Sequence, residues 1–149
     1  MQFQISDARL ILVHEADRVR AVPNAAPATA DPVAAWRALD AAHAAVRAAL
    51  ECELKREHDL SAVEYEVLDR LGECPRGKVR MQELAEGVHL TQSTCSRVVA
   101  RLEDEGLACR NMCADDRRGI FAALTEAGRE RVAAAAPTYR RVIAATLEP

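Results

Sequence analysis

The spacing of apolar positions predicts a long first helix over residues 32 to 58. Asp31 is a suitable N-cap, and Pro32 suits the first helical turn because its missing N–H would have no partner there. Side chains that could form one seam recur at steps of three and four residues: Trp36, Leu39, His43, Val46, Leu50 and Leu54. This near-heptad spacing is typical of a helix that packs against a partner. At 1.5 Å per residue the 26 residues from Val33 to His58 would be about 39 Å long, so we expect a second chain to cover the helix.

Shorter elements follow, and the local sequence indicates where they begin. Ser61 with Glu64 three residues later is a capping box, so a second helix is expected to start there. A short strand is expected over residues 78 to 80. Residues 81 to 87 and 91 to 105 then form two helices joined by a tight turn, which is the helix-turn-helix arrangement.

The helix expected over residues 91 to 105, with Thr91 as its cap, separates into two faces. Its apolar stripe consists of Cys95, Val98, Val99 and Leu102. The opposite face consists of Gln92, Ser93, Ser96, Arg97, Ala100 and Arg101. Glutamine and arginine can reach base edges in a major groove, while hydroxyl groups and helix-terminal N–H groups can hold phosphates. Taken alone, this face could equally be an ordinary solvated surface.

A charged hairpin is expected after this helix. Two short strands, over residues 107 to 113 and 119 to 124, flank a tip at residues 114 to 118. The tip carries Asp115, Asp116, Arg117 and Arg118. Arginines on a hairpin tip can enter a minor groove, where the potential is most negative, and aspartates can orient them by ion pairing. The tip could also be a soluble charged turn, but its place directly after a helix-turn-helix favours a wing.

These elements predict a mainly α fold with a small β-wing, that is, a winged helix-turn-helix with long dimerisation helices. The domain is expected to span residues 32 to 149, with a winged-helix lobe at 61 to 124 and dimerisation helices at 32 to 58 and 125 to 146. Pro137 is expected to kink the last helix. Residues 1 to 31 precede this domain, and three prolines within the eleven residues 22 to 32 indicate an arm and linker.

The charge balance restricts how such a protein could bind DNA. The net charge is -3, which is not that of a generally basic nucleic-acid-binding protein. From residue 76 to residue 118 there are eight lysines and arginines against seven aspartates and glutamates, a surplus of one. A few well-placed arginines would therefore have to carry any DNA contact. The negative charge also leaves open a winged-helix interaction module that does not bind DNA.

Other classes of function find little support in the sequence. There is no glycine-rich phosphate loop and no recognisable nucleophile–base set, so we expect no enzyme and no cofactor. The spacing of cysteine and histidine gives no zinc signature, so no metal site is expected. Five cysteines, an odd number, without a secretory leader indicate a reduced, cytoplasmic protein. The longest early apolar run, residues 10 to 13, is too short to cross a membrane.

Several segments in order resemble the MarR family of bacterial regulators. They are residues 61–68 (SAVEYEVL), 81–85 (MQELA), 90–94 (LTQST), 101–107 (RLEDEGL), 115–119 (DDRRG) and 124–128 (LTEAG). The similarity runs from about Pro32 to Thr146. It implies a homodimer that binds double-stranded DNA at a pseudo-palindromic operator, usually as a repressor. It also implies a small effector, often aromatic or phenolic, that releases the DNA.

The resemblance also assigns site residues by position. The DNA contacts that it implies are Thr91, Gln92, Ser93, Ser96, Arg97 and Arg101 in the recognition helix and Asp115, Arg117 and Arg118 in the wing. The effector pocket that it implies lies between the dimer helices and the DNA-binding lobe, and its candidates are Trp36, Arg37, His43 and Tyr65. Trp36 and His43 could instead belong to the dimer seam.

The chain departs from the family pattern at both ends. Family members usually continue beyond the position of Thr146 into a further dimerisation helix, and they rarely carry an arm such as residues 1 to 31. One hypothesis is that the arm replaces some of the missing dimer contacts. A loose arm, or an upstream choice of start codon, is an equal alternative.

Thiol sensing is an alternative within the same fold. Cys109 and Cys113 lie four residues apart on an expected wing strand, so both would face the same side. The sequence has no Cys-x-x-Cys motif, however, and Cys95 falls on the apolar stripe, where a small hydrophobic residue would serve.

Overall fold

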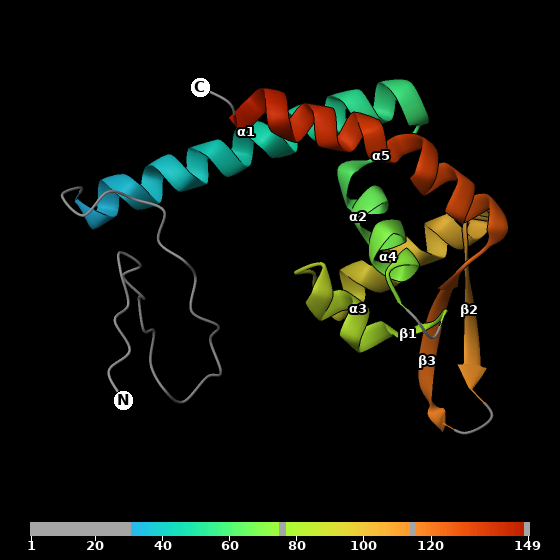
Figure 1. The fold of residues 1–149 in the computed structure, drawn as a ribbon. Coiled ribbons are helices and arrows are strands. Elements are labelled where there is room, and N and C mark those ends of the chain that lie inside the picture. The colour runs from blue at the N-terminus through green and yellow to red at the C-terminus, as the bar shows by residue number, and fades with distance from the viewer. Residues whose placement is uncertain (1–30, 75–76, 114–115, 148–149) are drawn as a thin grey trace, which may run out of the picture. The chain divides into compact units, whose positions relative to one another are not determined.

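The computed structural model describes residues 31–74, 77–113 and 116–147, and for residues 111–119 it describes the backbone only. The elements in chain order are α1 (Pro32–His58), α2 (Ala62–Gly72), β1 (Val79–Arg80), α3 (Met81–Gly87), α4 (Gln92–Asp104), β2 (Ala108–Cys113), β3 (Asp116–Leu124) and α5 (Glu126–Leu147). This order of helices and strands is the one that the sequence predicts (Figure 1). The expected arm and linker at residues 1 to 30 lie outside the described residues.

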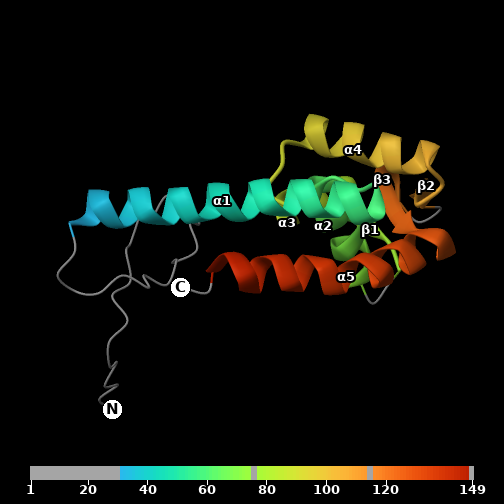
Figure 2. The ribbon, with the colours of Figure 1, turned by 90° about the horizontal axis from the view of Figure 1, so that it is seen from above.

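The chain divides into two compact units, residues 1–41 and 42–149, and α1 begins in the first and ends in the second. Within the second unit, α2 contacts α3, α4 and α5 and is therefore the central helix. Figure 2 shows α4 and α5 on opposite sides of α2. No helix in the described ranges has an apolar stretch long enough to cross a membrane.

The core of the second unit is built around α2. Its most deeply buried large side chains are Leu50, Leu54, Leu60, Val67, Leu68, Leu84, Cys95, Val99 and Leu102. The expectation that Leu50 and Leu54 lie on a seam with a second chain was wrong. The last turns of α1 pack into the lobe's own core, so these leucines are 1% and 0% exposed in the single chain. At the start of the expected seam, by contrast, the side chains of Trp36 and Leu39 are 63% and 57% exposed.

Polar contacts join the end of α1 to α5. The buried Thr138 hydroxyl donates to Glu57 Oε2 at 2.6 Å and lies 2.9 Å from His58 Nε2. Arg141 donates to Glu57 Oε1 at 3.0 Å. Arg131 donates to the carbonyl oxygen of His58 at 2.9 Å, which satisfies an acceptor that the end of a helix leaves open. These bonds fix α5 against the last turn of α1.

The sheet has the order β1-β3-β2, and both pairings are antiparallel. The strand predicted from residue 119 begins earlier, at Asp116, so the expected turn at residues 114 to 118 was too long. The physical reason is a shift of register between Met112 and Cys113, which allows Cys113 to pair with Asp116 beyond an irregular step. Ala114 and Asp115 of the expected tip lie outside the described residues.

The helix caps agree with the local sequence signals. Ser61 Oγ accepts from the N–H of Glu64, and Glu64 Oε2 accepts from the N–H of Ser61, so the capping box is confirmed. Thr91 caps α4 by accepting from the N–H of Thr94 at 3.2 Å. The last helix continues through Pro137 without interruption, although proline has no N–H to donate there.

Candidate nucleic-acid interface

The outer face of α4 is the centre of the candidate interface. Cys95, Val99 and Leu102 are fully buried, and Val98 is partly buried, so the predicted apolar stripe is confirmed. The opposite face is open: Thr91, Gln92, Ser93, Arg97 and Arg101 are exposed, and Ser96 is half-buried. The helix therefore presents a short polar surface with two arginines to solvent.

The hydroxyl groups at the start of α4 form a small cluster. Thr91 Oγ1 lies 2.9 Å from Thr94 Oγ1 and 3.2 Å from Ser93 Oγ, in addition to its capping bond. These bonds fix the first turn of the helix. That turn also carries the positive end of the helix dipole, so it suits a phosphate oxygen.

The two arginines of α4 have different surroundings. Arg97 reaches only the hydroxyl of Thr94, at 3.5 Å, and forms no ion pair with a carboxylate of the described residues. Arg101 instead lies with its Nε 3.0 Å from Glu64 Oε1 and 3.1 Å from Glu105 Oε1. The hydrogen bond to Glu105 and the charge of Glu64 raise the pKa of Arg101. Of the two arginines of α4, Arg97 is thus the one without a counter-charge among the described residues.

The wing, formed by β2 and β3, is described by its backbone near the tip. Arg117 and Arg118 lie near the start of β3. Asp115 and the side chains of residues 111 to 119 lie outside the described part of the chain. At the root of β2, Arg110 donates from its Nε to Glu103 at 2.8 Å and from its backbone N–H at 3.0 Å. These two bonds lower the pKa of Glu103 and fix the first strand of the wing to the last turns of α4.

A group of cations on the outer face of the sheet was not predicted from the sequence. Lys78 Nζ lies 5.4 Å from the ring centroid of Phe121, and the Arg80 guanidinium lies 5.6 Å from it. Arg80 and Phe121 are direct cross-strand partners, so the ring and both cations share one face. The alternation Lys78-Val79-Arg80 was the available signal, because Val79 is the buried member of the three.

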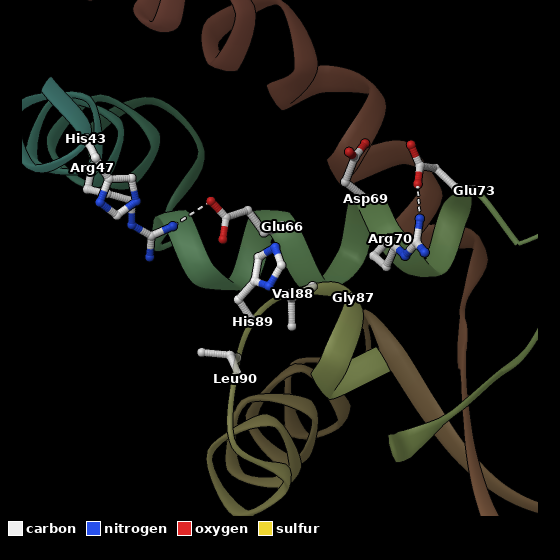
Figure 3. A pocket seen from close by; sticks show the side chains of 10 residues that line it. All are labelled: His43, Arg47, Glu66, Asp69, Arg70, Glu73, Gly87, Val88, His89 and Leu90. Atoms are coloured by element: carbon white, nitrogen blue, oxygen red, sulfur yellow. Dashed lines mark hydrogen bonds and ion pairs between the residues drawn. The ribbon is translucent and has the colours of Figure 1, made fainter. Parts of the chain in front are cut away.

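A groove of about 460 Å³ lies beside the helix-turn-helix. Its lining is His43, Arg47, Glu66, Asp69, Arg70, Glu73, Gly87, Val88, His89 and Leu90. Figure 3 shows His43 and Arg47 on α1, with the turn that leads into α4 on the opposite wall. Arg47 pairs with Glu66, and Arg70 pairs with Glu73 at 2.9 Å. His89 has a positive φ of 55°, a conformation that costs a non-glycine residue free energy.

The two predicted effector residues of the second unit, His43 and Tyr65, are not brought together in the groove. His43 lines the groove, but Tyr65 is 3% exposed and stacks on Tyr139 with ring centroids 4.4 Å apart. Burial raises the pKa of Tyr65 to about 12. Trp36 and Arg37 are exposed side chains in the other unit of the chain. The groove instead gathers charged residues of α2 that the sequence analysis did not single out, although they recur at helical spacing.

The cysteines that the structure describes are all free thiols: Cys52, Cys74, Cys95 and Cys109. Burial raises the pKa of the Cys95 thiol, which disfavours the reactive thiolate. The side chain of Cys113, the expected partner of Cys109, is outside the description. Within the described ranges, no three His, Cys, Asp or Glu side chains are grouped so as to hold a metal ion.

Comparisons with known proteins agree on one family. The sequence model of the MarR family matches residues 60–120. The structure is similar to Sco3205 of Streptomyces coelicolor, a MarR family transcriptional regulator solved in complex with DNA, with 35% identity, a TM-score of 0.73, and coverage of 80% of this chain and 77% of that one. It is also similar to AbsC, a MarR family regulator of the same organism, with 32% identity, a TM-score of 0.71 and coverage of 77% of both chains.

A curated relative is the HTH-type transcriptional regulator YkoM of Bacillus subtilis (strain 168). It is 29% identical over 75 residues, which is 50% of this chain and 47% of that protein, so the match spans about half of either sequence. Together with the two solved structures, this similarity confirms the predicted winged-helix fold.

Proposed function

Because this chain belongs to the MarR family of transcriptional regulators, we propose that it binds a specific DNA sequence with α4 as its recognition helix. The observation that carries the proposal is the outer face of α4, where Arg97 is exposed and has no counter-charge among the described residues. The DNA complex of the similar Sco3205 supports it. Membership of a family of regulators also confirms the expectation that the chain is not an enzyme.

The proposed contacts divide between two grooves. Gln92 and Arg97 read base edges in the major groove, and Thr91, Ser93 and Ser96 hold the neighbouring phosphates. In the wing, Asp115 orients Arg117, and Arg117 and Arg118 enter the minor groove. Such a regulator works where the DNA is, in the cytoplasm of a bacterium.

A homodimer on a pseudo-palindromic operator is the second part of the proposal. Two recognition helices must lie about 34 Å apart to reach successive major grooves, so a partner copy is required for a site of this kind. The exposed apolar side chains near the start of α1, which include Val33, Trp36 and Leu39, are the proposed contact of the two copies.

Ligand response is the third part. The groove beside the helix-turn-helix includes the turn Gly87 to Leu90, which leads directly into α4. Its ion pairs occupy Arg47 and Arg70, while the imidazoles of His43 and His89 form no hydrogen bond or ion pair with another described residue. We propose that a small aromatic or phenolic effector bonds these imidazoles and selects a conformation that releases DNA, which makes the protein a repressor.

A substitution in the wing tests the DNA-binding proposal. The probe is a duplex enriched by the full chain from a random-sequence library, and the measurement is fluorescence anisotropy over a range of salt concentrations. Arg117→Ala is expected to weaken binding about tenfold and to make the salt slope shallower by about one. The matched control is Arg129→Ala, an exposed arginine of α5 that pairs with Glu126, and it should change neither quantity.

A second candidate function is a winged-helix interaction module without DNA binding, and the net charge of -3 favours it. The same experiment separates the two. The DNA-binding proposal is wrong if the chain enriches no duplex, or if its binding depends neither on the sequence of the duplex, nor on salt, nor on Arg117. The interaction module is then the remaining candidate function.

A further inference from the structure

One carboxylate lies in the interior below the recognition helix. Glu64 is 3% exposed, and among the described residues it is the only charged side chain that is buried. Both of its oxygens have partners: Oε2 accepts from the N–H of Ser61 at 2.8 Å, and Oε1 faces Arg101 Nε at 3.0 Å. Since an unpaired buried carboxylate is costly, Glu64 and Arg101 hold each other in place.

The ion pair between Glu64 and Arg101 connects two elements, whereas the hydrogen bond from Arg101 to Glu105 stays within the end of α4. Glu64 belongs to the first turn of α2, and Arg101 belongs to the last turns of α4. Glu105, 3.1 Å from the same Nε, caps the end of α4 itself and is more exposed. Of the two contacts of Arg101, the ion pair with Glu64 is therefore the one that can resist a movement of α4 relative to α2.

The position of this ion pair on the side of α4 matters for the recognition helix. Contacts of Val99 and Leu102 hold α4 against the core, but apolar contacts have little directional preference. The ion pair joins a carboxylate in the interior to a guanidinium on the side of α4, so its two charges would separate if α4 turned, and it opposes rotation of α4 about its own axis. Arg97 lies one turn before Arg101 on the same face and would move with any such rotation.

We infer that Glu64 and Arg101 are positioning residues, which fix the rotation of α4 so that Gln92 and Arg97 face the major groove. This inference rests on the proposed DNA-binding function. It gives Arg101 a different role from the direct DNA contact that the family resemblance implies. Its guanidinium acts on α2, and the DNA is read by the residues that precede it on the helix.

The substitution Glu64→Gln separates positioning from electrostatics. Glutamine keeps the size of the side chain and can still complete the capping box, so α2 keeps its start. Removing a negative charge near DNA should tighten binding by charge alone. Positioning predicts the opposite: an affinity lower by about tenfold for the enriched duplex, within the range of coupling between residues in contact.

The matched control is Glu105→Gln. It removes the charge of the carboxylate that accepts the hydrogen bond from Arg101 Nε but leaves the ion pair with Glu64 of α2 intact. Its affinity for the duplex should be equal to that of the unmodified chain or higher. Both variants are compared well below their melting temperatures, so that the folded fraction is the same and a loss of affinity does not reflect unfolding.

The salt dependence distinguishes the two arginines of α4. Arg101→Gln should lower the affinity and leave the salt slope unchanged, while Arg97→Gln should make the slope shallower by about one. A slope reduced by Arg101→Gln, or a Glu64→Gln variant that binds as tightly as the unmodified chain, would overturn the inference while the DNA-binding proposal stands. If the unmodified chain enriches no duplex, both are wrong.

Discussion

Gly128 shows how a single missing side chain permits the packing of α5. A Cβ atom at this position would lie 2.0 Å from the carbonyl oxygen of Leu107, which belongs to the segment leading into β2. The first turn of α5 sits on that backbone, since the N–H of Thr125 donates to the same oxygen at 3.2 Å. Helix α5 can therefore approach the root of the wing only with glycine here.

Gly128→Ala is expected to destabilise the protein by about 3 kcal/mol, because the overlap is with backbone that cannot turn away. On an exposed helix the same substitution would stabilise by up to about 1 kcal/mol, so the sign alone is informative. Urea denaturation measures the free energy of unfolding. A variant as stable as the original chain would mean that α5 does not approach Leu107 so closely.

At the scale of elements, the sequence predicts what depends on neighbouring residues and fails where distant segments meet. The caps at Ser61 and Thr91 are local hydrogen bonds, and both are confirmed. The stripe of α4 is confirmed because one helical period determines it. The burial of Leu50 depends on where the lobe packs against α1, and the early start of β3 depends on an irregular pairing. Neither is encoded in a short pattern.

The candidate site shows the same division. The residues of α4 follow one another along a single helix, so their common face could be predicted from spacing alone. The groove joins α1, α2 and the turn before α4, and nothing in the sequence places His89 opposite Arg47. Tyr65 was assigned to the effector pocket by family position, and its stacking on Tyr139 depends on how α5 returns to α2.

The contact between α1 and α5 should make stability depend on acid pH. The hydrogen bond from Thr138, together with Arg141 and Arg56, lowers the pKa of Glu57. A lowered pKa in the folded state contributes stability above the pKa of the unfolded state, and this contribution is lost as the pH falls through the folded value. The loss should thus begin below about pH 4.3, the ordinary value for glutamate.

The variant Glu57→Gln isolates this effect, because glutamine has no proton to take up. At neutral pH its melting temperature should be lower than that of the original chain, and the difference should shrink as the pH falls into the acid range. Thermal denaturation followed by circular dichroism at a series of pH values measures both. A difference in melting temperature that stays constant with pH would show that the charge of Glu57 does not stabilise the folded protein.

At the scale of the whole molecule, the proposed dimer depends on the exposed apolar side chains at the start of α1. Leu39→Glu places a charge among Val33 and Trp36 and is expected to shift the protein from dimer to monomer at micromolar concentration. Analytical ultracentrifugation measures the change. The control is Ala38→Glu, an exposed position on the other side of the helix, which should leave the mass unchanged.

If Leu39→Glu and Ala38→Glu sediment alike, this face of α1 is not the dimer contact. DNA binding by a monomeric variant should also weaken, because two recognition helices on one duplex gain from being linked. Loss of dimer and loss of affinity should therefore appear together in the Leu39 variant.

The turn from Gly87 to Leu90 has two neighbours at once, the groove and the first residue of the recognition helix. Under the proposed function, one short segment therefore belongs to both binding equilibria. Thermodynamic linkage then requires the effect to run in both directions: an effector that weakens DNA binding by some factor must itself be bound more weakly, by that same factor, when DNA is present. The DNA duplex would thus act as an antagonist of the effector, and a regulator seated on its operator would respond only at higher effector concentrations than the free protein does.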